Sequence, residues 1–507
     1  MTSPAEPWRW QDGLLTASGV TTFWCLYGVS HASLRFVLSS TLSLDDGREN
    51  EILQSLSLGY QLRQPPLYEW LLWIVQQIVG TGLISHLLIR YVLIASLGVA
   101  TFIATHTISR DNRWSAAASL SLILSYPVGW QFHEWATQTL LLSIACLLTL
   151  AAVIRFLDRP AWIAATFIGL AAGLGLMSKF SFLLFLGGMI LAIVSIPATR
   201  ARLADARLLL AAAIAVAMVS PYIWWLIAVR GDLVNMASER LTSSNQSHIV
   251  RSAIGLLRLA WSLPAFLMPW LAFVAVAAWP AFRPSGKSRA PAPLPERIVL
   301  RGMLFAAVLM AIGVLGFGAN NIGERYMHPI LITAPAYVFA RIARIAPYEP
   351  HLRRLIGLVM IVMLVLFSIR VLAFTQNPLS RMARAESQPF VIPFEGLARA
   401  LKQRGIVDGT VVSPSARQAG NLRAFLPGLR GIAGDTSRFE RPPRRASDAR
   451  SCVMVWNEKE SDFARRISPT AASAGERIEV AVPVIFRGIR SGVWFLARLD
   501  PSTPACL

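Results

Sequence analysis

Charged residues and metal-ligating side chains are scarce in this chain. Only 15% of its 507 residues are charged, whereas a soluble globular protein carries about a quarter. The four cysteines include no CxxC pair and the seven histidines show no metal-ligand spacing, so we expect no metal site built from these residues. The spacing of Cys452 and Cys506 leaves open whether these two cysteines pair.

Acidic residues are outnumbered, and almost all basic residues are arginine. There are 48 basic residues, 44 of them arginine, against 28 acidic residues, which gives a formal net charge of +20. In a soluble protein this excess would indicate nucleic acid binding. In a chain that is 54% hydrophobic, basic residues collect on cytoplasmic loops, and membrane surfaces are anionic. We therefore expect a membrane partner and no nucleic acid.

Long apolar segments recur from near the N-terminus to about residue 374, and many reach the roughly 20 residues that cross a bilayer. The first begins near Leu14 and is followed by no small-residue cleavage site, so it is interpreted as a span and not as a cleavable signal peptide. We predict about eleven helical spans. They lie at about residues 14–36, 84–108, 114–130, 137–156, 161–178, 180–197, 208–229, 258–282, 302–318, 328–345 and 355–374.

The distribution of basic residues predicts the orientation of these spans. With the N-terminus inside, the even-numbered connections carry roughly twice as many basic residues as the odd-numbered ones, in agreement with the positive-inside rule. This orientation places the first outer loop, residues 37–83, and the tail, residues 375–507, outside the cytoplasm. Within the loop, residues 67–79 are apolar and rich in tryptophan but too short to span, which is typical of a helix in the membrane interface.

The tail differs in composition from the transmembrane domain, residues 1–374. It alternates short apolar runs with helix-like stretches separated by polar residues, glycine and proline. This pattern predicts a small extracytoplasmic α/β domain over residues 375–507. Residues 283–297, rich in proline, serine and basic residues, are typical of a flexible cytoplasmic linker.

Acidic residues gather directly after the first span, in LDDGRENE. One interpretation is that Asp45 or Asp46 is a general base acting on an acceptor hydroxyl. The other is structural: Ser43 caps a helix with Asp46 at the third position of a capping box, and acids in the first turn suit the helix dipole. The residue pattern does not decide between the two.

Cationic residues occur at or within the apolar segments. Arg63 precedes a proline pair that starts the predicted interfacial helix with Tyr68. Arg90 lies inside the second span and Lys179 interrupts a long apolar run. Such residues are functional candidates by default, although Arg90 can also snorkel and Lys179 can mark a tight outer turn. Three further candidates share the segment GERYMHP: Arg325, Tyr326 and His328.

Together these motifs resemble the bacterial GT-C glycosyltransferases of glycosyltransferase family 39, or protein-mannosyltransferase type, whose relatives include the aminoarabinose transferase of lipid A and galacturonic acid transferases. The resemblance covers about residues 14–345 and is specific for the superfamily, not for a substrate. Aminoarabinose transferases carry Glu-Lys where this chain has Arg63-Gln64, so hexose and uronic acid donors become comparable candidates. The matching motifs are Asp45-Asp46-Gly47-Arg48 with Glu51, Gln64-Pro65-Pro66-Leu67, Lys179, and Arg325-Tyr326 with Pro329.

The resemblance implies a GT-C fold and an inverting glycosyltransferase, either hexosyl or uronosyl. The donor would be a polyprenyl-phosphate sugar, and the acceptor an anionic lipid or glycan such as lipopolysaccharide or lipid A, on the periplasmic face of a bacterial inner membrane. It implies Asp45 as the base with Asp46 as the alternate, and no metal or cofactor. The implied phosphate ligands are Arg63, Lys179, Arg325 and Arg90, and the further site candidates are Arg48, Glu51, Tyr326, His328 and Tyr68.

A polytopic transporter or lipid flippase is the alternative function. Such proteins show inverted repeats or paired broken helices near the membrane midplane. The sequence shows neither, and its candidate charges gather at one face of the predicted bundle.

Overall fold

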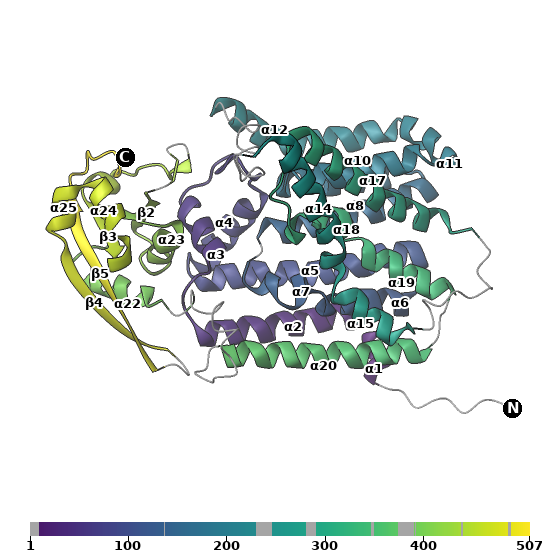
Figure 1. Ribbon diagram of the computed structural model, residues 1–507, viewed down its shortest axis with the longest axis horizontal. Helices are drawn as coiled ribbons and strands as arrows, with labels where there is room; N and C mark the ends of the chain where they lie inside the picture. The colour runs from purple at the N-terminus through teal and green to yellow at the C-terminus, as the bar shows by residue number, and fades with distance from the viewer. Residues whose placement is uncertain are drawn as a thin grey trace.

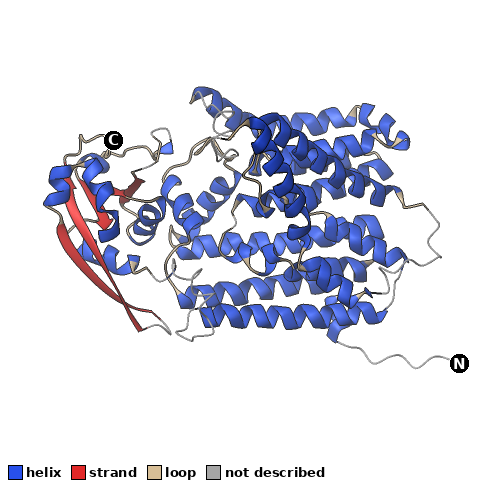
Figure 2. Cartoon of the chain, viewed as in Figure 1, coloured by secondary structure: helices blue, strands red, loops and turns tan. Residues whose placement is uncertain are grey.

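The structure is a computed structural model, and a helical bundle and a small sheet domain form its two ends (Figure 1). Helices α3 (Leu44–Ile52) and α4 (Leu67–Val79) lie between the two parts. Within the described residues, every strand belongs to the small domain (Figure 2). The predicted domain boundary at residues 374–375 lies outside the described residues. These are 10–135, 137–229, 246–279, 291–345, 349–373, 390, 392–434, 436–437, 440–484 and 488–507.

The bundle consists of long apolar helices joined by shorter ones. The main helices are α2 (Ala17–Leu38), α5 (Leu83–Ser109), α8 (Gln138–Asp158), α9 (Trp162–Ser178), α10 (Phe182–Val194), α12 (Arg207–Ala228), α14 (His248–Leu267), α17 (Leu294–Phe317), α19 (Ala334–Ile345) and α20 (Glu349–Ala373). The shorter elements are α1 (Trp10–Leu14), α6 (Asn112–Ser121), η1 (Leu122–Leu124), α7 (Tyr126–Gly129), η2 (Gln131–His133), α11 (Pro197–Arg200), η3 (Ala201–Ala204), α15 (Trp270–Ala277), η4 (Glu324–Tyr326) and α18 (His328–Leu331).

The chain is a multi-pass membrane protein by the length and composition of these helices. Among the described residues, six helices are long and apolar enough to cross a membrane, or seven if the pair Phe182–Val194 and Pro197–Ala204, bent by 113°, counts as one span. The predicted number of eleven spans is therefore not confirmed. Helix α9, with 17 residues, is apolar but short.

Two predicted spans are broken, and one predicted linker is partly helical. The span predicted at 114–130 divides because α6 ends at Ser121 and Ser125 caps the new helix α7. The span predicted at 258–282 begins earlier, as α14, and is interrupted before α15. The first turn of α17 takes up the end of the predicted linker 283–297, while residues 280–290 lie outside the described residues.

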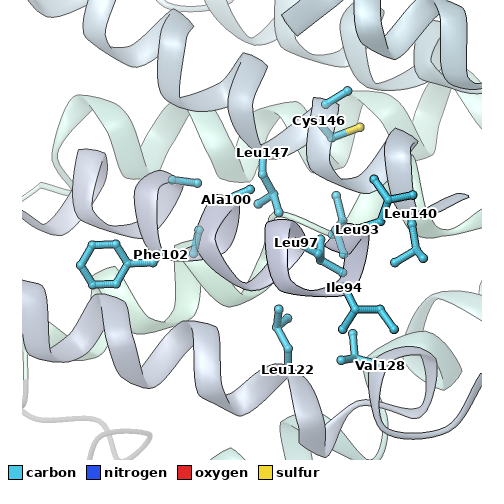
Figure 3. Packing of buried hydrophobic residues seen from close by; sticks show 14 of the residues in the cluster. Leu93, Ile94, Leu97, Ala100, Phe102, Leu122, Val128, Leu140, Cys146 and Leu147 are labelled. Carbon is cyan, nitrogen blue, oxygen red and sulfur yellow. The ribbon is translucent and has the colours of Figure 1, made fainter. Parts of the chain in front are cut away.

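Helix α5 runs through the centre of the bundle and is held by close packing. Leu93, Ile94 and Leu97 of α5 lie among apolar side chains of η1, α7 and α8 (Figure 3). A Cβ on Gly98 would lie only 2.1 Å from Nε1 of Trp24, so α2 approaches α5 closely at this glycine. The same indole donates to Ser119 Oγ at 2.9 Å. This contact satisfies a polar group that lipid cannot satisfy.

The C-terminal domain is a five-stranded α/β sheet in the order β2-β1-β3-β5-β4. Strand β1 pairs in parallel with β2 and β3, while β5 pairs antiparallel with β3 and β4. Cys452 and Cys506 form a disulfide, which resolves the pairing left open by the sequence. The elements are α22 (Phe394–Gln403), β1 (Gly409–Ser413), α23 (Ala416–Phe425), β2 (Leu429–Ala433), η8 (Ser447–Ala449), β3 (Cys452–Asn457), η9 (Glu458–Glu460), α24 (Ser461–Ile467), α25 (Pro469–Ser473), β4 (Glu476–Val484) and β5 (Gly488–Leu499).

Helix α23 of this domain packs directly on α3 of the outer loop. The helices meet at two glycines: a Cβ on Gly420 would lie 1.9 Å from Gly47 O, so neither position has room for a side chain. Asn50 Nδ2 donates to Gly420 O at 2.8 Å, and Arg423 Nη1 donates to Asn50 O at 2.9 Å. Leu42 N donates to Asn421 Oδ1 at 2.8 Å. The position of α3 therefore depends on both parts of the molecule.

Candidate active site

The start of helix α3 shows the serine N-cap of the structural interpretation, while the Asp46 carboxylate is paired with Arg90. Ser43 is the N-cap of α3, and Ser43 Oγ accepts a hydrogen bond from Asp46 N at 3.1 Å. Asp45 and Asp46 thus lie in the first turn, where the helix dipole favours negative charge. Capping does not exclude a catalytic role, because the two neighbouring side chains have different surroundings.

Asp46 forms a buried ion pair with Arg90. Its Oδ1 accepts from Arg90 Nη2 at 2.6 Å and lies 3.5 Å from His86 Nδ1, and the side chains of Asp46 and Arg90 are 2% and 1% exposed. Burial alone raises the pKa of Asp46, but the charge of Arg90, with His86 and Ser43 close to the carboxylate, lowers it below its ordinary value. Arg90 Nη1 donates to His133 O at 2.7 Å. The pair therefore joins α3 to α5 and η2.

Asp45 is half-buried, and its carboxylate makes no hydrogen bond or ion pair to the described residues. Burial, then the charge of Asp46, raises the pKa of Asp45 to about 6, against the opposing charges of Arg90, Arg63 and Lys179. A carboxylate with this pKa is ionised at neutral pH yet basic enough to accept a proton. Asp45 is thus the better candidate base of the two.

The cations expected to bind phosphate are placed differently from one another. Arg63 and Lys179 are both close enough to act electrostatically on Asp45. Lys179 follows the last residue of α9, and its Nζ donates to Thr139 Oγ1 at 3.1 Å. Both terminal nitrogens of Arg90 donate hydrogen bonds within the protein, one to His133 O and the other to Asp46 Oδ1. This geometry suits a residue that holds Asp46 in place.

The GERYMHP segment contributes one buried residue and two nearer the surface. His328 is buried between the rings of Phe132 and Phe266, with Nδ1 3.4 Å from Ser143 Oγ. Arg325 is exposed and stacks over the ring of its neighbour Tyr326 at 5.0 Å. His328 also lies within electrostatic reach of Lys179, so this segment borders the Lys179 side of the site.

Arg48 and Glu51 face the C-terminal domain. Arg48 forms ion pairs with Glu51 at 2.8 Å and with Glu440 at 2.7 Å. Glu51 Oε1 also accepts from Ala433 N at 2.8 Å and from Thr436 Oγ1 at 2.7 Å. These two sequence candidates therefore hold α3 to the C-terminal domain.

A buried polar network beside Asp45 was not predicted from the sequence. Gln138 Nε2 donates to Glu49 Oε1 at 2.9 Å and to Glu69 Oε1 at 3.2 Å, and both glutamates are at most 3% exposed. The hydroxyl of Tyr68 is buried nearby without a hydrogen-bond partner in the described part of the chain. Glu69 could have been suspected from its place in PPLYEW, whereas Gln138 is the first residue of α8 and its sequence context gives no signal.

Within the described ranges, no group of three or more histidine, cysteine, aspartate or glutamate side chains is placed to hold a metal ion.

Comparison with known proteins gives the same fold. Residues 63–225 match the family model of dolichyl-phosphate-mannose-protein mannosyltransferases. ArnT from Cupriavidus metallidurans in the apo state has a TM-score of 0.62 at 13% identity, over 96% of this chain and 98% of that chain. ArnT from the same organism bound to undecaprenyl phosphate has a TM-score of 0.58 at 14% identity, over 95% and 98%. At this identity the likeness establishes the fold.

Two relatives are similar in sequence. Lipopolysaccharide core galacturonosyltransferase RgtA from Rhizobium johnstonii is 29% identical over 321 residues, which make up 62% of this chain and 63% of RgtA. Lipopolysaccharide core galacturonosyltransferase RgtB from the same organism is 26% identical over 438 residues, or 85% of each chain. The match thus spans less than two thirds of RgtA but most of RgtB. The resemblance to GT-C superfamily membrane glycosyltransferases is confirmed.

Proposed function

We propose that this protein is an inverting glycosyltransferase that moves a sugar from a polyprenyl-phosphate donor to a cell-envelope acceptor. The observation that carries the proposal is the open carboxylate of Asp45, with its pKa raised to about 6, in a helix fixed by the neighbouring Asp46–Arg90 ion pair. Asp45 is available to react, while the ion pair of Asp46 with Arg90 fixes the helix that carries both residues. Two further cations, Arg63 and Lys179, act on the same carboxylate.

In the proposed reaction, Asp45 accepts the proton of an acceptor hydroxyl as its oxygen attacks the anomeric carbon. The attack comes from the face opposite the phosphate, so the anomeric configuration inverts. The bond to the phosphate oxygen breaks, and polyprenyl phosphate leaves as a dianion. A dianionic leaving group needs positive charge more than it needs a general acid. Lys179 supplies this charge, with Arg325 at the rim of the same side.

The sugar and acceptor are proposed from the relatives. RgtA and RgtB are named as lipopolysaccharide core galacturonosyltransferases, and ArnT binds undecaprenyl phosphate in its crystal structure. We therefore favour a uronosyl donor on a polyprenyl phosphate and an anionic lipopolysaccharide acceptor for this chain. The hexosyl alternative differs only in the group at C5 of the sugar.

The reaction is proposed to occur on the periplasmic face of the inner membrane. Disulfides persist in oxidising compartments such as the bacterial periplasm, and the Cys452–Cys506 disulfide lies in the domain that packs on α3. The positive-inside distribution of basic residues gives the same side. The alternative function, a transporter or lipid flippase, has no comparable support, because the relatives found are transferases.

The test is transfer in membranes from radiolabelled polyprenyl-phosphate sugars to lipopolysaccharide. Asp45→Asn should abolish transfer while the purified protein keeps its melting temperature. Asp462→Asn is the matched control, because the Asp462 side chain is 88% exposed in the C-terminal domain. Full transfer by Asp45→Asn, or no transfer by the wild type from any polyprenyl-phosphate sugar, would refute the proposal.

A further inference from the structure

Arg63 presents a guanidinium whose outer edge has no partner among the described residues. Its Nε donates to Gln61 Oε1. Neither Nη atom of this half-buried side chain has a hydrogen-bond or ion-pair partner among the described residues. An arginine held at Nε in this way keeps its outer nitrogens available to a ligand.

A chain of buried hydrogen bonds fixes the orientation of Arg63. Gln61, which is fully buried, donates through Nε2 to Glu69 Oε1 at 2.9 Å, and the backbone around Gln61 accepts from Tyr222 OH at 3.1 Å. Glu69 shares the amide of Gln138 with Glu49. The network therefore aligns the guanidinium through Gln61 without placing a carboxylate on its outer edge.

The two glutamates of this network are unsuited to neutralise Arg63 fully. Burial, and then the charge of Glu69, raises the pKa of Glu49 well above its ordinary value, and burial raises the pKa of Glu69 as well. Two buried carboxyl groups that share one amide hold a proton between them more readily than two negative charges. Each also has one oxygen, Oε2, without a hydrogen-bond partner in the described residues. Arg63 is thus left with positive charge to offer.

The place of Arg63 relative to the base suits one part of a uronosyl donor. Its guanidinium is close enough to act electrostatically on both Asp45 and Glu49. In a hexuronosyl phosphate, the carboxylate-bearing carbon and the anomeric carbon are the two neighbours of the ring oxygen. A receptor for that carboxylate must therefore lie within one sugar ring of the base that serves the anomeric carbon.

Arg63 and Lys179 differ in chemistry, and each suits a different anionic group of the donor, the sugar carboxylate or the phosphate. The planar fork of arginine matches a carboxylate through two parallel hydrogen bonds, whereas lysine is a compact point charge. We infer that Arg63 binds the sugar carboxylate of a uronosyl donor and selects that donor over neutral sugars, with Gln61 as its positioning residue. Lys179 remains for the phosphate. The inference rests on the proposed function and names the substrate class of that same site.

The test compares two lipid donors, polyprenyl-phosphate galacturonate and its carboxamide, which keeps the size of the group but loses its charge. Wild-type protein should use the carboxamide about 100-fold less efficiently in kcat/KM, as expected when charged hydrogen bonds are lost. Arg63→Gln should remove this preference by losing about 100-fold on the galacturonate donor and little on the carboxamide. Arg477→Gln, an exposed arginine whose side chain is 62% accessible, should retain the full preference.

Each other outcome overturns the inference. Equal losses on both donors in Arg63→Gln would mean that Arg63 binds the phosphate. Equal use of both donors by the wild type would exclude carboxylate recognition, whether or not any variant folds. Gln61→Met should weaken the preference about tenfold with an unchanged carboxamide KM; loss of both would indicate a purely structural role. The increase in melting temperature caused by each donor measures the preference in binding, without turnover. A protein that binds the galacturonate donor preferentially but does not transfer it would therefore contradict the proposed function and not the inference about Arg63.

Discussion

Substitution of the neighbouring aspartates Asp45 and Asp46 should affect different properties, activity for Asp45 and stability for Asp46. Asp46→Asn removes the carboxylate from an ion pair of 2.6 Å in which both side chains are at most 2% exposed. Breaking one partner of a buried pair leaves an uncompensated charge and typically costs about 3–5 kcal/mol. We expect Asp46→Asn to lower the free energy of unfolding by this amount, and any folded remainder to retain Asp45 chemistry.

Asp45→Asn should keep its stability and lose its activity. Burial raises the pKa of Asp45 to about 6, so at pH 7 the ionised carboxylate is less favourable in the folded protein than in the unfolded chain. Asparagine removes that penalty, and the free energy of unfolding should not fall. Transfer should nevertheless be lost, because no carboxylate remains to accept the proton of the acceptor.

The assay combines unfolding in detergent with single-turnover transfer for each variant. Arg90→Gln added to Asp46→Asn should recover about 1–3 kcal/mol relative to the sum of the single changes, since both charges are then absent. The exposed pair Asp462–Arg465 is the control, and its disruption should cost under about 1 kcal/mol. A stable, inactive Asp46→Asn beside an active Asp45→Asn would refute the assignment of the base.

Three further outcomes are expected. The kcat/KM for transfer should fall about tenfold per pH unit below about 6, because protonated Asp45 cannot act as a base, and should be level above it; a profile flat to pH 4 would contradict this assignment. Gly420→Ala should make the C-terminal domain more sensitive to protease and lower transfer, because the new Cβ would lie 1.9 Å from the backbone oxygen of Gly47. Gly357→Ala is the control and should change neither property, because a Cβ there has no neighbour within 4 Å. Lys179→Ala should raise the KM for the donor about tenfold or more without changing the melting temperature. The control, Lys402→Ala at an exposed position, should leave the KM unchanged. A lowered melting temperature with a normal KM in Lys179→Ala would show that Lys179 has a structural role.

The parts of the fold that could be predicted are those set by continuous local pattern. The apolar runs that form α5 and α8 are long and unbroken, so the structure has these helices within a few residues of the predicted spans. The break between α6 and α7 was missed because an apolar run hides a capping serine, Ser125, that starts a new helix. Length and hydropathy do not record such a local competition for backbone hydrogen bonds.

The candidate site was predictable as a set of residues but not as a set of roles. The acidic motif gives Asp45 and Asp46 equal standing, since only the direction of each side chain on α3 decides which one meets Arg90. Arg48 and Glu51 lie in the same motif, yet their partners Glu440 and Thr436 are almost 400 residues away in the chain. Roles that depend on such distant partners become visible only in the folded molecule.

Helix α3 links the C-terminal domain to the proposed chemistry. Within its nine residues, Asp46 contacts α5, Gly47 and Glu51 contact the domain, and Asp45 remains open. A catalytic group must be held within a fraction of an ångström by its surroundings, and short helices are poorly stable alone. We therefore propose that the domain supports the base through α3, in addition to any cover it gives the site or contact it makes with the acceptor. This support explains why a glycine contact and an arginine–glutamate pair to the domain occur on the same short helix that carries Asp45.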